Sequence, residues 1–417
     1  MYSKVKGVTD NFFDMIYWSG VRKKIETHLK KYNFSEIELP TLEHVSLFER
    51  GLGFETDVVS KQMFLIQSRG DNEEQICLRP EGTAGTMRAF LEQQAAMPIP
   101  CNVYSYGSMF RYERPQKGRF REFHQFNFEM IGAHSLFYDV WCIKMLHTLF
   151  LEVLEIDNFV LKLNYLGQSQ DRHEYMIALR NFLEKKQALL CETCVRRLKT
   201  NVLRILDCKS KSCQKLLQDA PQLFSFFSEE TKEEWQRLCN GLQELSVTFI
   251  HDQQLVRGLD YYNKTVFEFV STELGAQNTF CAGGRYDGLA EQLGSKQSIP
   301  SVGGAIGMER LLLILESKKE ALSEKRLPLS CIIPCAPEQY ILALLLADFL
   351  QSHNKCVDIL FDGTSLKNKM KKANNAGAHY VLILGENEQN THSVTVKNMT
   401  TGQEQIVLQT EVHKIIF

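Results

Sequence analysis

The sequence lacks several features that mark particular classes of protein. It has no run of about 18 apolar residues, and its start, MYSKVKGVTDNFF, lacks the apolar core and small-residue cleavage site of a secretory signal. The patterns HExxH and GxxxxGK are also absent, which excludes the zinc-protease and P-loop interpretations. We therefore expect no association with a membrane, and a cytoplasmic location.

The chain also has little net charge. Its 48 Lys and Arg residues nearly balance 50 Asp and Glu residues, which gives a formal net charge of -2. Such a chain does not attract a polyanion as a whole, so any contact with nucleic acid depends on local basic patches. The hydrophobic fraction of 44% and the charged fraction of 24% are typical of a globular protein.

A chain of 417 residues is longer than one hydrophobic core usually supports, so we expect several domains. Residues 1–165 and 252–326 mix short β-like runs with helices and hold nearly all the glycine-anchored motifs, so we interpret them as two parts of one domain. Residues 166–251 have helical spacing, which predicts a helical insertion domain. Residues 327–417 alternate strand-like and helix-like patterns, which predicts a small α/β domain.

The most informative stretch, residues 104–132, predicts two strands joined by a loop. Because side chains alternate between the two faces of a strand, polar and aromatic groups gather on one face of this hairpin. They are Arg111 and Glu113 on the first strand, and Phe123, Gln125, Asn127 and Glu129 on the second. The loop adds four basic residues, Arg114, Lys117, Arg119 and Arg121. Arginine matches phosphate oxygens and an aromatic ring can stack on a base, which indicates a polyphosphate pocket. Taken alone, the stretch favours a solvated charged face instead.

Two further motifs, each taken alone, are weak evidence for a functional site. LRPEGTAGTMRAF places Glu81 and Thr83 before a predicted helix, where the threonine could simply cap it. In LVRGLDYY, Arg257 and the tyrosines Tyr261 and Tyr262 precede an alternating strand, a pattern that is also common in turns.

Two glycine-rich motifs follow. CAGGRYDGL has a glycine pair that allows close backbone approach, followed by Tyr286. VGGAIGMER precedes an apolar helix that carries Arg310, whose charge needs either a carboxylate or a bound phosphate as partner.

Together these segments resemble the motifs of class II aminoacyl-tRNA synthetases, and specifically the histidyl-tRNA synthetase family, over essentially the whole chain. FSEIELPTLEHVSLFER around Pro40, the FRYER and FHQFNFE hairpin and GGAIGMER resemble the general motifs, whereas LVRGLDYY and AGGRYDGL resemble the histidine-specific signatures. The resemblance implies an α+β fold, with an antiparallel sheet flanked by helices, a helical insertion domain and a C-terminal α/β anticodon-binding domain. It also implies a homodimer with the segment around Pro40 at the subunit interface.

The activity that this resemblance implies is that of a ligase in protein biosynthesis. ATP, with Mg²⁺ bridging its phosphates, would activate L-histidine to histidyl-adenylate, and histidine would then pass to the 3′ end of its cognate tRNA. The alternative is a histidine-binding regulatory subunit of the first enzyme of histidine biosynthesis. Such relatives generally lack the anticodon domain and the signature arginines, whereas Arg111, Arg257 and Arg310 are present here.

The resemblance also implies roles for individual residues. Arg111 would hold the α-phosphate and Phe123 would stack under adenine. Arg119 and Arg310 would bind the β- and γ-phosphates, and Glu113 belongs to the same ATP-binding set. Arg257 would lie against the reacting carboxylate and α-phosphate, which makes Arg257 and Arg111 the catalytic pair.

For the amino acid, the resemblance implies that one group of side chains holds the α-ammonium and a second group surrounds the imidazole. The first group is Glu81, Thr83 and Gln125. In the second, Glu129 and Tyr262 would bond the ring nitrogens, and Tyr261 and Tyr286 would shape the pocket. Arg114 and Gln116 are our candidates for contact with the tRNA acceptor end.

Two weaker signals remain. Cys191, Cys194, Cys208 and Cys213 have spacing that allows a four-thiolate zinc site, although the continuous pattern of the segment between them favours reduced free thiols. A basic run in the C-terminal domain fits either a tRNA contact or a solvated helix face, and the resemblance favours tRNA. Its members are Lys367, Lys369, Lys371 and Lys372.

Overall fold

The predicted hairpin forms two long neighbouring strands, β5 (Cys101–Phe110) and β6 (Glu122–Ile131), in a large sheet. The computed structural model describes residues 2–11, 14–67, 74–275, 278–363 and 365–416. Within these residues the chain divides into a first unit, Met1–Ser323, and a second unit, Glu324–Phe417. Each unit has its own sheet and its own core.

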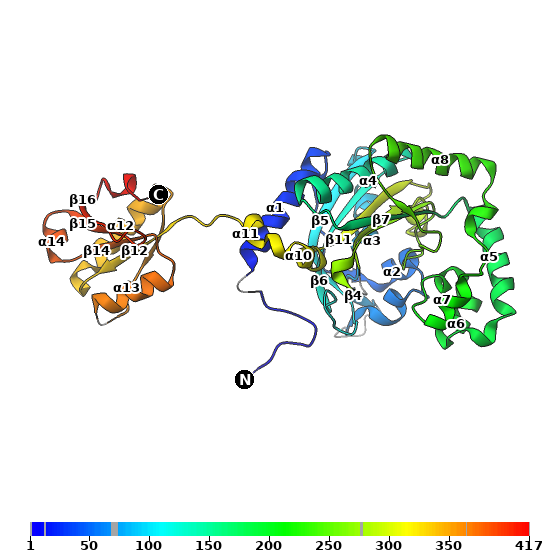
Figure 1. Ribbon diagram of the computed structural model, residues 1–417, viewed down its shortest axis with the longest axis horizontal. Coiled ribbons are helices and arrows are strands. Elements are labelled where there is room, and N and C mark those ends of the chain that lie inside the picture. Colours follow the sequence, from blue (N-terminus) through cyan, green and yellow to red (C-terminus); the bar gives the residue numbers. More distant parts are fainter. Residues whose placement is uncertain (1, 12–13, 68–73, 276–277, 364, 417) are drawn as a thin grey trace. The chain divides into compact units, whose positions relative to one another are not determined.

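In the described part of the first unit, eight strands form the large sheet in the order β1-β5-β6-β11-β10-β9-β7-β8 (Figure 1). The further strands are β1 (Ser35–Glu36), β7 (Phe159–Tyr165), β8 (Ile250–His251), β9 (Thr265–Ser271), β10 (Thr279–Arg285) and β11 (Ser301–Gly307). Neighbouring strands are antiparallel except at the two edges, where β1 runs parallel to β5 and β8 runs parallel to β7. The expected antiparallel sheet is therefore present, with a short parallel strand at each edge.

The side-chain alternation of β6 separates core from site. Phe126, Phe128 and Met130 are fully buried in the hydrophobic core. Gln125 and Glu129 lie on the opposite face, because side chains two and four residues apart on a strand point the same way. In register, Glu129 is opposite Gly303 of β11, and Gln125 is opposite Gly307.

Helices cover this sheet. They include α1 (Met15–Lys31), α2 (Val45–Leu52), α3 (Thr83–Gln93), α4 (Phe137–Thr148), α9 (Leu289–Gln292), α10 (Met308–Ile314) and α11 (Lys319–Leu322). Both α3 and α10 contact β6, and this brings Thr83 and Arg310 to the strand that carries Gln125 and Glu129. Among the residues that the structure describes, we find no helix with the length and apolarity needed to cross a membrane.

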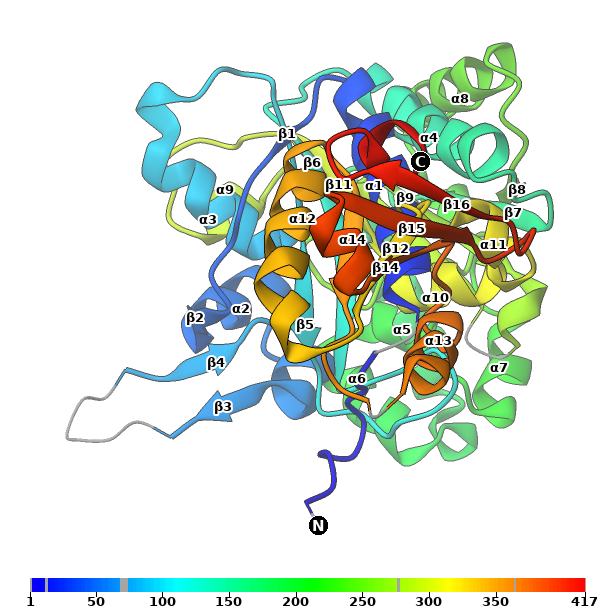
Figure 2. The same ribbon diagram turned by 90° about the vertical axis from the view of Figure 1, so that its left-hand side faces the viewer.

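A helical segment interrupts the sheet between the neighbouring strands β7 and β8. It contains α5 (Ser169–Glu184), α6 (Glu192–Thr200), α7 (Lys211–Leu217) and α8 (Glu229–Glu244), drawn in green in Figure 1. A separate small sheet of the first unit pairs β2 (Leu42–His44) and β3 (Phe64–Ile66) with β4 (Ile76–Leu78). Figure 2 shows β3 and β4 extending away from the large sheet.

The second unit is a five-stranded sheet in the order β13-β12-β14-β15-β16, counted over its described residues. Its strands are β12 (Leu329–Pro334), β13 (Cys356–Ile359), β14 (Tyr380–Leu384), β15 (Ser393–Asn398) and β16 (Glu404–Leu408). Its helices are α12 (Tyr340–Ser352), α13 (Leu366–Asn375) and α14 (Glu386–Asn390). The first three strands in this order are parallel and the last two pair antiparallel, as expected for a small α/β domain.

Candidate active site

A cleft of about 560 Å³ opens over the large sheet of the first unit. Its walls come from the β5–β6 hairpin, from β9, β10 and β11, from the start of α10, and from the helical segment. All five residues expected to bind ATP line it, namely Arg111, Glu113, Arg119, Phe123 and Arg310, and so do Gln125 and Arg257. Residues nearly 200 positions apart in the sequence therefore share one cleft.

Of the four arginines that line this cleft, Arg111, Arg119 and Arg310 lie close enough together for their charges to act on one another. Arg111 donates from Nε to the carbonyl oxygen of Pro80 at 2.9 Å, and Arg310 donates from Nε to that of Gly118 at 2.9 Å. The pKa of Arg310 is lowered, first by burial and then by the charges of Arg119 and Arg111. Like charges held together in this way repel each other, and a bound polyanion would relieve the repulsion.

An aromatic ring lies beside this positive charge. The guanidinium carbon of Arg111 is 5.3 Å from the ring centroid of Phe123. An arginine over a ring, next to two further arginines, provides both a stacking surface for a base and donors for phosphate oxygens.

Two carboxylates pair with cleft arginines. Arg257 pairs with Glu268 of β9, and Arg119 pairs with Glu113. The charge of Glu268 raises the pKa of Arg257 against the lowering effect of its burial. We did not predict Glu268 from the sequence, although a lone acidic residue between Phe267 and Phe269 of an alternating strand was a signal for it.

A second, enclosed cluster surrounds Glu129, whose side chain is almost fully buried. Thr83 donates from its hydroxyl to Glu129 Oε1 at 2.6 Å, and the hydroxyl of Tyr286 donates to Oε2. Burial raises the pKa of Glu129 to about 8, although both hydrogen bonds act in the opposite direction. This carboxyl is therefore mostly protonated at pH 7.

Glu81 and two tyrosines complete the cluster. The Glu81 carboxylate accepts the backbone N–H groups of Thr83 and Ala84, both at 2.8 Å, and thus caps α3. The hydroxyl of Tyr261 donates to Glu81 Oε2 at 3.4 Å, and the Tyr261 and Tyr262 ring centroids are 4.5 Å apart. Glu81, rather than Thr83, therefore caps this helix, which leaves the Thr83 hydroxyl to contact Glu129.

Glycines make room for these side chains. A Cβ atom at Gly303 would lie 1.8 Å from Glu129 Oε2, and one at Gly284 would lie 2.8 Å from Cδ1 of Tyr262. Both distances are shorter than van der Waals contact, so any larger residue would displace the cluster. Gly284 in one glycine pair and Gly303 in the other are thus explained by the side chains that pack against them.

Gln125 lines the cleft and has a polar side-chain atom that is available to a ligand. Within the described residues, its buried Oε1 has no hydrogen-bond partner. A buried carbonyl oxygen without a donor costs about 1–3 kcal/mol, which a ligand that donates a hydrogen bond would recover.

Two protein-family models match this chain, and the first covers the residues of the cleft and of the enclosed cluster. The family model for histidyl-tRNA synthetase matches residues 17–311, and that for the anticodon-binding domain matches residues 330–416. The histidine–tRNA ligase of Acinetobacter baumannii (strain SDF) is 42% identical over 400 residues, which cover 94% of this chain and 93% of that protein. The chain belongs to the histidyl-tRNA synthetase family.

Solved structures agree with this membership. The crystal structure of apo histidyl-tRNA synthetase from S. aureus matches with a TM-score of 0.81 and 29% identity, covering 100% of both chains. A structure from Bacillus halodurans, described as an ATP phosphoribosyltransferase regulatory subunit/histidyl-tRNA synthetase, matches with a TM-score of 0.62, 18% identity and 90% coverage of this chain (96% of that chain). The second match shows the fold alone. The predicted family and α+β fold are confirmed.

The residues expected to meet tRNA lie in two places. In this synthetase fold, Arg114 and Gln116 are exposed in the loop between β5 and β6. On α13, Lys367, Lys371 and Lys372 are exposed. Lys369 was wrongly grouped with them, because it is 4% exposed and its Nζ donates to the carbonyl oxygen of Pro334 at 2.8 Å.

Proposed function

We propose that the protein activates L-histidine with ATP to form histidyl-adenylate and then transfers histidine to the 3′ end of tRNA(His). The observation that carries this proposal is the pairing of two sites in one unit. An arginine-lined cleft suits a triphosphate, and the adjoining enclosed cluster offers carboxyl and hydroxyl groups to a small amino acid. The names and full-length coverage of the relatives support it.

ATP occupies the arginine-lined cleft in this proposal. Arg111 binds the α-phosphate, Arg119 and Arg310 bind the outer phosphates, and the ring of Phe123 stacks on adenine. Among the carboxylates that line the cleft, Glu113 and Glu268 would hold Mg²⁺, because carboxylate oxygens suit this cation. The ion held there would supply positive charge that neutralises part of the triphosphate.

Histidine occupies the enclosed cluster. Glu129 and Tyr262 contact the imidazole nitrogens, and Tyr261 and Tyr286 close the pocket around the ring. Glu81, Thr83 and Gln125 take the α-ammonium, for which the unpartnered Oε1 of Gln125 is a suitable acceptor. The substrate carboxylate then faces the cleft, towards Arg257.

The first chemical step needs no general base, because the histidine carboxylate is already ionised at neutral pH. Its oxygen attacks the α-phosphorus, and pyrophosphate leaves. Arg111 and Arg257 stabilise the charge that builds up on the phosphoryl oxygens, so that catalysis is positioning together with electrostatic stabilisation. In the second step the 3′-terminal hydroxyl of tRNA attacks the activated carbonyl carbon, and AMP leaves. The proton of that hydroxyl passes to a phosphate oxygen of the adenylate or to Glu81.

In this proposal each domain of the chain has its own role. Residues 1–165 and 252–326 form the catalytic domain, residues 166–251 are the insertion domain and residues 327–417 bind the anticodon. Arg114 and Gln116 approach the acceptor end of the tRNA. The exposed lysines of α13 supply local positive charge that the chain as a whole lacks.

We also propose a homodimer that forms through the small sheet of β2, β3 and β4. Leu42 is 53% exposed, Leu65 is 65% exposed and Ile66 is 42% exposed on this sheet. Exposed large apolar side chains gathered on one element mark an interaction surface. Sedimentation velocity of the intact chain tests this assembly.

The activity is tested by amino-acid-dependent exchange between ATP and pyrophosphate across the twenty amino acids. We expect exchange with histidine alone, and a loss of at least about a hundredfold in Arg257→Ala, since removing a transition-state electrostatic partner costs about 2.7–4 kcal/mol. The control is Arg237→Ala, a side chain that is 63% exposed on α8 and pairs only with Glu233 in the described structure. Histidine binding without any exchange in the wild type would contradict the proposal in favour of the regulatory-subunit alternative.

A further inference from the structure

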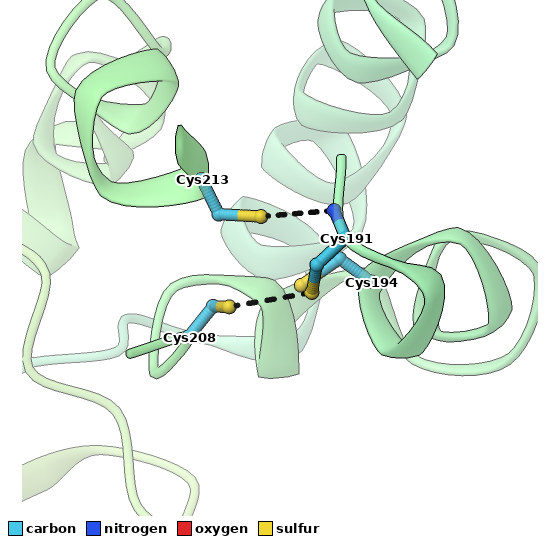
Figure 3. A group of neighbouring side chains, drawn as sticks. All are labelled: Cys191, Cys194, Cys208 and Cys213. Carbon is cyan, nitrogen blue, oxygen red and sulfur yellow. Dashed lines mark hydrogen bonds between the residues drawn. The ribbon is translucent and has the colours of Figure 1, made fainter. Parts of the chain in front are cut away.

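Four cysteines of the helical segment converge on one point. Cys191 caps the N-terminus of α6, Cys194 lies in its first turn, Cys208 follows α6 in a connecting segment and Cys213 belongs to α7. Their Sγ atoms all lie within 4.8 Å of one another (Figure 3). Cys194, Cys208 and Cys213 are buried, and Cys191 is partly buried.

The spacing of the sulfur atoms is that of ligands around one ion. Four thiolates at about 2.3 Å from a tetrahedral Zn²⁺ are about 3.8 Å from each other. Sγ of Cys191 lies 3.8 Å from Sγ of Cys208. A disulfide would require about 2.05 Å, so the sulfurs are too far apart to be bonded and are placed correctly for a shared metal.

Backbone N–H groups point at the same sulfur atoms. The N–H of Cys191 donates to Sγ of Cys213 at 3.3 Å, and the N–H of Ser210 donates to Sγ of Cys208 at 3.4 Å. Such outer hydrogen bonds orient the ligands of a metal site and stabilise sulfur in its ionised form. Free thiols packed into a core would need no such donors.

We propose that Cys191, Cys194, Cys208 and Cys213 bind one structural Zn²⁺ as four thiolates. On binding, the four thiols lose their protons to solvent, and no redox change takes place. Four protein ligands complete a tetrahedral shell, so the ion has no open position for catalysis. It instead ties the start of α6 to the start of α7.

The segment that this metal holds is part of the active-site wall. Asp207, Cys208 and Lys209 line the cleft, as does Gln214 of α7. Arg204, just before this segment, is 5% exposed, and its Nη1 lies 4.0 Å from Oδ1 of Asp260 in the histidine-specific signature. The metal therefore fixes one wall of the cleft against Arg257 and its neighbours. The zinc site itself does not depend on the proposed function, whereas its effect on ATP binding rests on it.

Metal content is the first test. The full-length chain, expressed without a histidine tag in zinc-supplemented medium, is dialysed against EDTA and analysed by inductively coupled plasma mass spectrometry. We expect about one zinc per chain in the wild type, and less than about 0.2 in Cys194→Ser and Cys208→Ser. Cys239→Ser, at a buried cysteine of α8 outside the cluster, is the matched control and retains zinc.

The proposal would be overturned by a wild-type chain that holds less than about 0.1 zinc, or that holds iron in place of zinc. A Cys208→Ser variant that keeps its zinc would also overturn it. Because the serine variants can fail to fold, a second measurement uses the wild type alone. A mercurial reagent that modifies thiols should release about one equivalent of zinc to a chromophoric indicator. No release from the modified protein would also refute the site.

The structural role has its own test. Zinc removed under mild denaturation should lower the thermal midpoint and raise the KM for ATP more than tenfold, and both should return on adding Zn²⁺ alone. If removing the bound zinc changes neither the thermal midpoint nor the KM for ATP, the proposed role of the metal in the cleft wall is refuted. If zinc is present and histidine-dependent exchange is absent, the metal site stands and the proposed function fails.

Discussion

Glu129 gives the sharpest test of how the enclosed cluster holds histidine. Burial raises its pKa from an ordinary value of 4.5 to about 8, so the empty site carries a proton on this carboxyl at pH 7. An uncharged imidazole that binds against a protonated carboxyl shares that one proton. Near pH 7, binding therefore neither takes up nor releases a proton.

The affinity for histidine should fall both above and below neutral pH, for two different reasons. Above pH 8 Glu129 is ionised in the empty site, so binding must take up a proton and the Kd for histidine rises. Between pH 7 and pH 9 the protonated fraction falls from about 0.9 to about 0.1, which weakens binding about tenfold, or about 1.4 kcal/mol. Below the imidazole pKa of about 6.5, binding must release a proton, so affinity falls again.

The assay is titration calorimetry of histidine into the free enzyme between pH 6 and pH 9, repeated in buffers of different ionisation enthalpy. Glu129→Gln removes the titrating group but keeps the shape, so we expect weaker binding that lacks the alkaline loss. The α-amino group of histidine titrates equally in both proteins and cancels in the comparison. Parallel pH profiles of the two proteins would refute the reasoning. A wild type that takes up no proton on binding histidine at pH 9 would refute it as well, and this second result does not depend on the variant.

Two further predictions concern shape and assembly. Gly303→Ala places a methyl group 1.8 Å from Glu129 Oε2, so the KM for histidine should rise more than tenfold, or stability fall by about 1–3 kcal/mol, in exchange and urea-unfolding assays. Gly288→Ala, which has open space around it, is the control, and equal effects would contradict the steric argument. Leu65→Asp should convert a particle of twice the 48.0 kDa chain mass to the monomer in sedimentation velocity, whereas Ile406→Asp in the second unit should not. A wild-type chain that sediments as a monomer would contradict the proposed homodimer.

The sequence predicted which side chains of the hairpin share a face, because this depends on local periodicity. Side-chain alternation alone puts Gln125 and Glu129 on one face of a strand and Phe126 and Phe128 on the other, as the structure has them. Arginines at the hairpin and at the head of an apolar helix are similarly visible as charges that need a partner. The family resemblance then supplied their roles, which remain to be tested.

Other contacts were not predicted because they depend on how the folded backbone brings particular groups together. Glu268 of β9 pairs with Arg257, which lies in the segment between β8 and β9, and Glu81 caps α3 in place of Thr83. Lys369 looks like its neighbours on α13, but the helix turns it towards the carbonyl of Pro334.

The sequence by itself determined the elements and their amphipathic faces, since these depend on spacing within about ten residues. The roles predicted for individual side chains came from the family resemblance. Only the tertiary structure decided which distant groups share a site. It placed Arg111 and Arg310 in one cleft, buried Glu129 deeply enough to raise its pKa, and brought four cysteines within reach of one ion. The physical reason is that charge, desolvation and metal coordination act over a few ångströms of space, whatever the distance along the chain.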